Sequence, residues 1–235
     1  IRNAQKQKVP YMLIAGDAYG DNETIAGGAG SDTVYVNFTT NTDVTREATM
    51  TGVETLDAVF NASVSFEGNK VDDLATINLG TTVTVDTDPL SATGYKTGTA
   101  ASTSRADFNR MDATLTTVNF TANANQGLEV DYDAVFGVNP ELTLNITGKT
   151  STIGNAGGSS VRAINASTVN LNHNGTVAAT LANGLQVDDN LVGGHTTNVS
   201  VTNNSDADLT IATLGPAPLY FGTAIVDGNT VQNLN

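Results

Sequence analysis

The chain contains no cysteine and no tryptophan, and aromatic residues make up only 6% of its 235 positions. Without cysteine, a disulfide framework, a zinc–thiolate site and a thiol nucleophile are all excluded. The small aromatic content argues against a lectin, because sugar-binding modules usually present exposed aromatic side chains. Basic residues are also few: Lys and Arg total 10 against 24 Asp and Glu, a formal net charge of −14. Such a charge repels nucleic acid and anionic lipid and attracts divalent cations.

The sequence also lacks long apolar runs. No run approaches the roughly 20 residues that a helix needs to cross a bilayer, so membrane insertion is not expected. The chain starts at Ile1 without a recognisable signal peptide, and we expect it to be part of a larger polypeptide. Hydrophobic residues nevertheless reach 39% and charged residues only 14%. This balance predicts a packed fold with uncharged polar surfaces rather than a disordered acidic chain.

Alternation of apolar and polar residues with a period of two recurs along the chain and predicts strands, whereas helix signals are poor. One short helix is expected near Asp107–Ala113, because Arg105, Phe108 and Met111 fall at helical spacing. The expected strands are Thr33–Phe38, Ala75–Leu79, Thr81–Asp86, Thr114–Thr121, Gly127–Phe136, Glu141–Thr147, Ser167–Leu171, Thr197–Thr202 and Asp208–Thr213.

A short pattern of Thr, an aliphatic residue, Asn and an apolar residue occurs four times. The last two intervals are 26 and 25 residues, and the first is 41 because it contains a polar run, Thr87–Arg110, interpreted as an inserted loop. A period near 25 residues is typical of solenoids, in which stacked coils bury apolar faces that one coil cannot bury alone. We therefore predict an all-β fold, a parallel β-solenoid of β-helix-like form, with a β-sandwich as the alternative. The apolar residues expected inside are Ile77, Leu79, Val118, Phe120, Leu144, Ile146, Val169 and Leu171.

The most specific motif lies near the N-terminal end. Residues Gly27–Tyr35 match the calcium-binding nonapeptide G-G-x-G-x-D-x-U-x at every fixed position. Nine residues earlier, residues 21–25 repeat its second half in degenerate form, with Glu23 where Asp is expected. Glycines let such a turn point its backbone carbonyls at an ion, and the Asp adds charge. This chemistry suits Ca²⁺, which takes six to eight oxygen ligands. The residues expected to hold Ca²⁺ here are Asp17, Asp21, Glu23, Gly27, Gly28, Gly30 and Asp32.

The number of nonapeptides is small for a regular calcium roll. Two nonapeptides, about 18 residues, make one coil of such a roll, and an ion lies between successive turns. The positions one such coil before and after Asp32 are Ile14 and Met50, and neither supplies charge. We therefore expect a short or capping form of the roll, with further ligands from Asp17, Asp43 or a following loop.

The stretch Thr51–Leu56 reads T-G-V-E-T-L, and Thr- and Asn-rich strands follow it. Together with the nonapeptide, it resembles bacterial S-layer proteins and large RTX adhesins. The resemblance is clear over about residues 16–60, and beyond them it is limited to short β repeats, Asp-containing turns and the absence of cysteine. The resemblance implies an extracellular bacterial surface protein exported by type I secretion. It also implies a structural module, not an enzyme, that calcium rigidifies and joins into a lattice or filament. An RTX-like N-terminal part, residues 1–60, would continue into a Thr/Asn-rich β-repeat region, residues 61–235.

Paired acids in expected turns are further candidate calcium ligands. They are Asp72 with Asp73, Asp188 with Asp189 and Asp206 with Asp208, and turn-forming residues in water are the alternative explanation.

A run of acids on one expected strand, Glu129, Asp131 and Asp133, alternates with apolar residues on the other face. A solvated face is the favoured interpretation, with calcium binding and general acid–base chemistry on a sugar as alternatives. The two histidines, His173 and His195, lie in polar, Gly-flanked contexts and are interpreted as loop residues.

Two other functions compete with the structural module. An adhesin stalk or tip would use the same fold to present a binding surface to a cell-surface glycan. A polysaccharide lyase or epimerase would combine a β-helix with a catalytic groove. The epimerase-type Asp-Pro-His motif is absent, since Asp88-Pro89 is followed by Leu90, and basic residues to neutralise uronates are few.

Overall fold

The structure, a computed structural model, describes residues 11–15, 24–38, 45–46, 48–60, 64–80, 105–121, 127–133, 135, 138–147, 152–154, 160–188, 198–212, 214–216, 224–226 and 230–234. Every regular element within these ranges is a β-strand, and none is a helix. The strands are β1 (Tyr11–Ala15), β2 (Thr24–Ala26), β3 (Thr33–Phe38), β4 (Thr45–Arg46), β5 (Thr49–Thr51), β6 (Thr55–Phe60), β7 (Val64–Glu67), β8 (Thr76–Leu79), β9 (Arg105–Met111), β10 (Thr117–Phe120), β11 (Gly127–Tyr132), β12 (Glu141–Ile146), β13 (Thr152–Ile153), β14 (Val161–Ile164), β15 (Thr168–His173), β16 (Ala179–Leu181), β17 (Leu185–Asp188), β18 (Asn198–Asn203), β19 (Leu209–Ile211), β20 (Leu214–Pro216), β21 (Ala224–Val226) and β22 (Thr230–Leu234).

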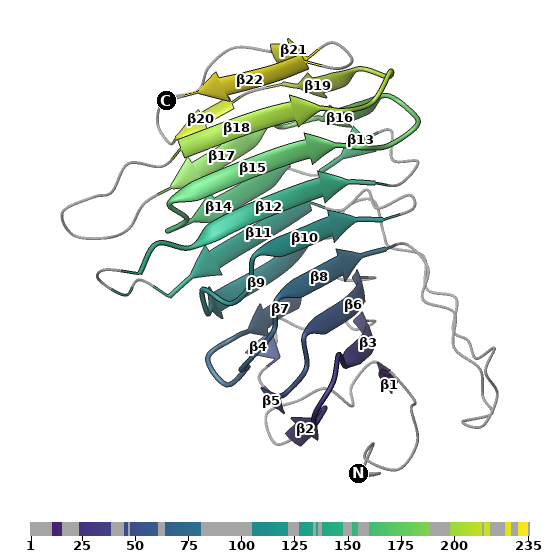
Figure 1. Cartoon of the computed structure of the whole chain (residues 1–235), viewed down its shortest axis with the longest axis vertical. Coiled ribbons are helices and arrows are strands. Elements are labelled where there is room, and N and C mark those ends of the chain that lie inside the picture. The colour runs from purple at the N-terminus through teal and green to yellow at the C-terminus, as the bar shows by residue number, and fades with distance from the viewer. Residues whose placement is uncertain are drawn as a thin grey trace.

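Consecutive strands alternate between sheets, and each returns beside the strand one coil earlier (Figure 1). A nine-stranded sheet has the order β1-β3-β6-β8-β10-β12-β15-β18-β22, and a seven-stranded sheet has the order β20-β17-β14-β11-β9-β7-β4. The smaller sheets are β13-β16-β19-β21 and β2-β5. The described strands pair in parallel up to β20, and only β21 and β22 pair antiparallel with their neighbours. This arrangement is consistent with the β-helix-like fold, whereas a β-sandwich would need antiparallel pairs.

The apolar side chains of the four Thr-x-Asn-x units are all buried with 0% exposure, as predicted: Ile77, Leu79, Val118, Phe120, Leu144, Ile146, Val169 and Leu171. The first three units stack in register. The fourth is shifted by two residues, because Thr143 pairs with Asn170 and Asn145 pairs with Asn172. A shift of two keeps the same side chains inward, since side chains alternate between faces with a period of two.

The coil length varies around the predicted period of about 25 residues. The stacked residues Asp57, Asn78, Asn119, Asn145 and Asn172 are separated by 21, 41, 26 and 27 residues. The loops between strands therefore differ in length from coil to coil, while the strand positions remain aligned. The run interpreted as an inserted loop also ends too late, because β9 starts at Arg105. The strand expected over Thr81–Asp86 lies outside the described residues.

The helix expected near Asp107–Ala113 is also wrong, because Arg105–Met111 forms strand β9. Phe108 pairs with Val130 and Met111 pairs with Tyr132, so β9 has one more residue than β11 between these two pairs. The extra residue is accommodated at Arg110, whose φ is 50°. Such a β-bulge returns Met111 to the core three residues after Phe108, and this spacing imitates a helix.

The core lies between the nine-stranded and seven-stranded sheets. Phe38 stacks on Phe60 with ring centroids 4.5 Å apart, and both Phe60 and Phe66 contact Phe108 at 5.6 Å. These aromatic rings connect β3 and β6 of the first sheet with β7 and β9 of the second.

The interpretation of His173 as a loop residue is wrong, because His173 is the last residue of β15 and its side chain is fully buried. The other histidine, His195, lies outside the described residues.

Candidate functional site

Three turns lie one above another at the N-terminal end of the stack. They follow Ile25, Met50 and Val71, which pair with one another, and they lead into β3, β6 and β8. The turns comprise residues 27–32, 52–54 and 73–75, so the first is three residues longer than the other two. We call them the turn column. The longer first turn is the part of the nonapeptide that carries its glycines and its Asp.

Glycines shape the turn column for two reasons. A Cβ on Gly27 would lie 1.8 Å from the carbonyl oxygen of Gly52, so only glycine allows the first two turns to approach this closely. Gly28, Gly30 and Gly52 have φ angles of 107°, 132° and 60°, which side chains strongly disfavour. The Gly27 N–H donates to the Thr51 carbonyl at 2.9 Å and holds the turns together.

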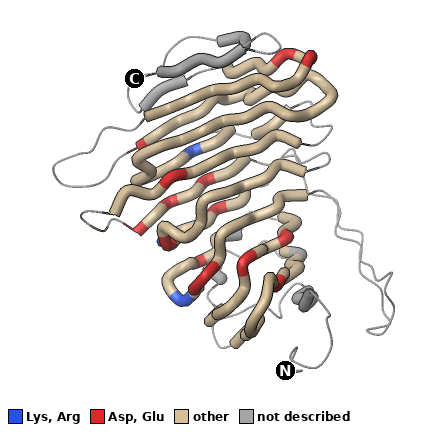
Figure 2. The backbone as a smooth tube through the Cα atoms, viewed as in Figure 1, with Lys and Arg blue, Asp and Glu red and all other residues tan. Residues whose placement is uncertain are grey.

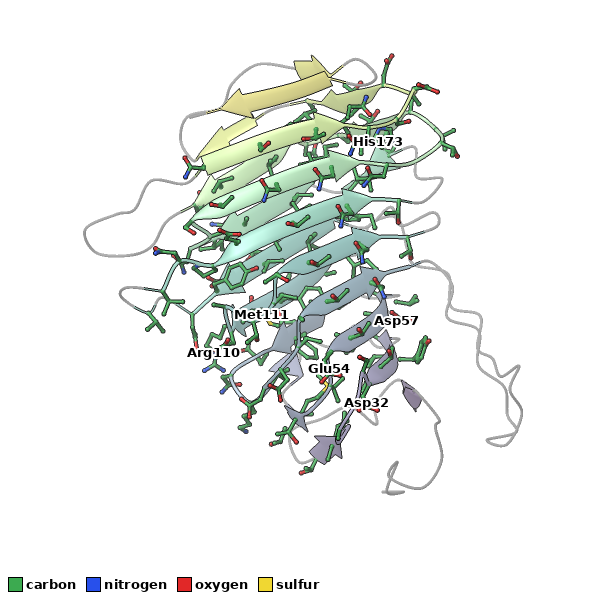
Figure 3. All side chains as sticks on the ribbon, viewed as in Figure 1. Asp32, Glu54, Asp57, Arg110, Met111 and His173 are labelled. Carbon is green, nitrogen blue, oxygen red and sulfur yellow. The ribbon has the colours of Figure 1, made fainter. Side chains whose placement is uncertain are left out.

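Asp32 contacts the turn one coil further along the chain, where Glu54 lies. The Asp32 N–H donates to Glu54 Oε2 at 2.7 Å, and the Thr55 N–H donates to the Asp32 carbonyl at 3.1 Å. Figure 3 shows the two acidic residues at this end of the molecule. The interval between them is 22 residues, so the coil here is longer than the roughly 18 residues of a regular calcium roll, and the acid beside Asp32 is Glu54.

One carboxylate oxygen in the turn column has no hydrogen-bond partner. Asp32 Oδ2 is buried, and it is the only such side-chain oxygen or nitrogen in the part of the chain that the structure describes. Buried polar atoms are nearly always paired, because an unpaired one costs about 1–3 kcal/mol. A cation beside this oxygen would remove that cost.

The pair Asp72–Asp73, predicted as a separate site, belongs to the same column. The Gly52 N–H donates to Asp73 Oδ2 at 3.2 Å, and Asp73 has a φ of 73°, equivalent to the positive φ of Gly52 one coil earlier. The Asp72 N–H donates to the Met50 carbonyl, and its side chain is exposed. The structure thus brings the two predicted groups to one edge of the stack.

The donor chemistry of the column fits calcium in kind. The free Asp32 oxygen, the second carboxylate on Glu54 and the backbone carbonyls of the Gly-rich turn are hard oxygen ligands of the type that calcium prefers. Among the described residues, no group of three or more His, Cys, Asp or Glu side chains is close enough to hold a metal. Five other candidates lie outside the described residues: Asp17, Asp21, Glu23, Asp43 and Asp189.

Acidic residues on the outer face of the seven-stranded sheet are held by arginines. Asp188 Oδ2 accepts from Arg162 Nε at 2.5 Å, and Glu129 Oε2 lies 3.2 Å from Arg162 Nη1 and 3.4 Å from Arg105 Nη1. Glu129 is only 9% exposed, so the solvated-face interpretation is wrong for this residue. Burial raises the pKa of the Asp107 carboxyl, which its hydrogen bond with Arg105 opposes.

Sequence reasoning did not select Glu54, although a signal for it is present. Asp32-Thr33-Val34 and Glu54-Thr55-Leu56 share the order acid, Thr, aliphatic residue, and their strands pair Thr33 with Thr55. With a coil length of about 22 residues, this shared order would have predicted that Glu54 lies beside Asp32.

Comparisons with known proteins identified no relative of this chain. No family model matches the chain, and neither a curated protein nor a solved structure matches it. The described residues contain no helix that is long and apolar enough to cross a membrane.

Proposed function

We propose that this chain is a structural module of a secreted bacterial cell-surface layer or surface filament, folded as a parallel β-solenoid and rigidified by calcium at the turn column. The observation that carries the proposal is the buried, unpaired Asp32 Oδ2 within a complete calcium-type nonapeptide. A fixed anionic oxygen without a donor is stable only if a cation or a donor approaches it.

Asp32 would supply the charged ligand, and Glu54 on the next coil a second carboxylate. Carbonyl oxygens of Gly27, Gly28 and Gly30 would complete part of the shell, with Asp17, Asp21 and Glu23 as the remaining candidates. Calcium bound in this way bridges two consecutive coils, so it would fix the N-terminal end of the stack. Millimolar affinity is typical of extracellular calcium modules and suits a protein exported to the cell surface.

A structural role is supported by the way the chain uses its residues. The described strands form one long stack with a continuous core, and the arginine-bound acids described above are held in ion pairs. The net charge of −14 opposes association of copies, and divalent cations between carboxylates reduce this repulsion. Calcium would therefore favour both the rigid module and its assembly.

Thermal unfolding in calcium and in EDTA tests the calcium site. Asp32→Asn keeps the shape of the side chain but removes its charge, so it should lower the Tm in calcium and have little effect in EDTA. Gly27→Ala is the matched steric control, because its Cβ meets the Gly52 carbonyl whether or not calcium is present. It should lower the Tm in both buffers.

Equal destabilisation by Asp32→Asn in the two buffers would exclude a ligand role for Asp32. Light scattering and electron microscopy during a calcium titration test the assembly: ordered layers or filaments are expected with calcium and dispersal after EDTA. A folded protein that stays monodisperse over the millimolar range would exclude calcium-driven assembly.

A further inference from the structure

The outward side chains of the nine-stranded sheet form two continuous columns across consecutive strands, which we call the Thr/Asn face. One column, the Thr column, contains Thr33, Thr55, Thr76, Thr117, Thr143, Asn170 and Ser200. The other, the Asn column, contains Tyr35, Asp57, Asn78, Asn119, Asn145, Asn172 and Thr202.

Hydrogen bonds between side chains hold the Asn column in one conformation. Each asparagine donates its Nδ2–H to the side-chain oxygen of the residue on the preceding strand. Asn172 donates to Asn145 (3.0 Å), Asn145 donates to Asn119 (2.9 Å), and Asn119 donates to Asn78 (2.8 Å). The last donation is from Asn78 to Asp57 at 2.5 Å. Side-chain ladders of this kind favour flat sheets and reduce the entropy that an interface loses on binding.

The Thr/Asn face is nearly free of charge. Asp57 is the single ionisable carboxylate in the two columns, and neither column contains Lys or Arg. Figure 2 shows the strands of this sheet from β8 to β18 mostly without charged residues, with Glu141 at the start of β12 as a flanking exception. The outer face of the seven-stranded sheet, by contrast, carries Arg105, Asp107, Glu129, Arg162 and Asp188.

We infer that the Thr/Asn face is the surface through which two copies of this chain pack face to face. The inference rests on the proposed function as an assembling module and names the surface that it uses. In a molecule with a net charge of −14, this face lets copies approach with little like-charge repulsion, because its two columns contain a single carboxylate.

A second copy also matches the face in spacing. Its strands repeat at the same separation of about 4.8 Å, so a contact made at one strand recurs at each following strand. Short side chains in register can interdigitate in a dry interface, as they do between paired sheets with Asn ladders. The pairing is isologous, since the same patch contributes from both copies.

The size of the face fits one contact of a larger assembly. Seven of the nine strands carry the columns, from β3 to β18. At about 4.8 Å per strand and 3.3 Å per residue, the two columns cover roughly 450 Å² per copy. Specific interfaces start at about 1,200 Å² in total, so a single pair of faces forms a small, weak contact that gains strength from repetition in a lattice.

Sedimentation velocity of the full chain in calcium, over a range of concentrations, tests the inference. Thr117→Lys/Thr143→Lys places charge at the centre of the face and should weaken association at least about tenfold, because like charges meet across the interface. Ser65→Lys, an outward position on β7 of the charged sheet, is the matched control and should leave association unchanged. Circular dichroism and the Tm verify that each variant folds.

Cysteine cross-linking gives a second readout that does not weaken the interface. The chain has no cysteine, so Thr117→Cys introduces a single reporter, and oxidation in calcium should yield covalent dimers. Ser65→Cys should yield few at the same concentration.

Association of the lysine double variant equal to that of the unchanged chain overturns the inference, even if calcium still stabilises the fold. Loss of the calcium effect on Tm, with association still blocked by the lysines, overturns the proposed calcium site and leaves the interface standing. A monomeric chain that binds a crystalline glycan or ice through this face, with binding lost in the lysine double variant, assigns the face to another occupant and also overturns the inference.

Discussion

Asp57 accepts the last hydrogen bond of the asparagine ladder in the Asn column and sets the direction of the bonds between the asparagines. An ionised carboxylate only accepts, so each asparagine that follows presents its Nδ2–H to the preceding strand. Burial raises the pKa of Asp57, and hydrogen bonds from Asn78 and Tyr35 oppose this effect. The folded chain therefore holds a proton on Asp57 to a higher pH than the unfolded chain does.

This shift predicts the effect of Asp57→Asn. The folded state binds the Asp57 proton more tightly than the unfolded state does. The free energy of unfolding therefore falls as the pH rises from the ordinary aspartate pKa through the raised pKa of the folded state, and above this range the ionised Asp57 is destabilising. The amide keeps the oxygen that accepts from Asn78 and removes the buried charge. We expect stabilisation of less than about 1 kcal/mol at neutral pH, because solvent still screens part of the charge.

Urea unfolding of the two proteins at pH 7 and at about pH 3 measures this effect. The difference should vanish at the lower pH, where Asp57 is protonated in both states. Asn78→Asp is the opposite change and should destabilise at pH 7, since it places like charges on adjacent strands. A benefit of Asp57→Asn that is equal at both pH values means that charge is not its cause.

Strands in this chain are kept in register by side-chain ladders as well as by the backbone. Asn119 of β10 donates to Asn78 of β8 and accepts from Asn145 of β12, so one residue connects three strands. Each such bond contributes about 0.5–1.5 kcal/mol. The ladder also explains how the fourth unit is aligned, because β15 places Asn172 rather than Asn170 beside Asn145.

Substitution Asn119→Thr tests the ladder at the level of the strand. Threonine is the better strand former, yet it cannot make either bond, so we expect a net loss of about 1 kcal/mol in the free energy of unfolding. The same change at the exposed Asn198 of β18 is the control and should be neutral or slightly stabilising. Equal outcomes at the two positions, measured by urea unfolding, would show that the ladder adds nothing.

At the scale of the whole molecule, the direction of the strands reverses at the C-terminal end. β22 pairs antiparallel with β18, and β21 pairs antiparallel with β19 (Figure 1). The open edge of a parallel stack is a template for pairing with other chains. These two strands cover the edges of β18 and β19 and so act as a cap.

Ending the chain after Pro216 removes both capping strands. The shortened chain should aggregate by edge pairing, visible as a rise in light scattering and in thioflavin fluorescence. Thr210→Lys on β19 should reduce the aggregation of the shortened chain, because a charged side chain on an edge opposes pairing. A shortened chain that remains monodisperse would show that the cap is dispensable.

The local pattern of the sequence determined which side chains enter the core. Period-two alternation sufficed to place Ile77, Val118, Leu144 and Val169 inside, because the choice of face depends only on neighbouring residues. Composition likewise indicated the all-β class and the uncharged polar surface. The sequence also contained the glycine turn, whose positive φ angles at Gly28 and Gly30 only glycine adopts readily.

Outside the first three Thr-x-Asn-x units, whose common pattern indicated their alignment, only the tertiary structure decided which residues stack on which. Loops of different length separate the strands, so no fixed interval predicts that Asp32 lies beside Glu54, that Asp73 joins the same column, or that Asn145 contacts Asn172. The bulge at Arg110 had the same effect within one strand, because a single extra residue turned period two into an apparent helical spacing. The register of the strands depends on the total energy of core packing, ladder bonds and turn contacts over whole coils. A local sequence pattern does not contain that total.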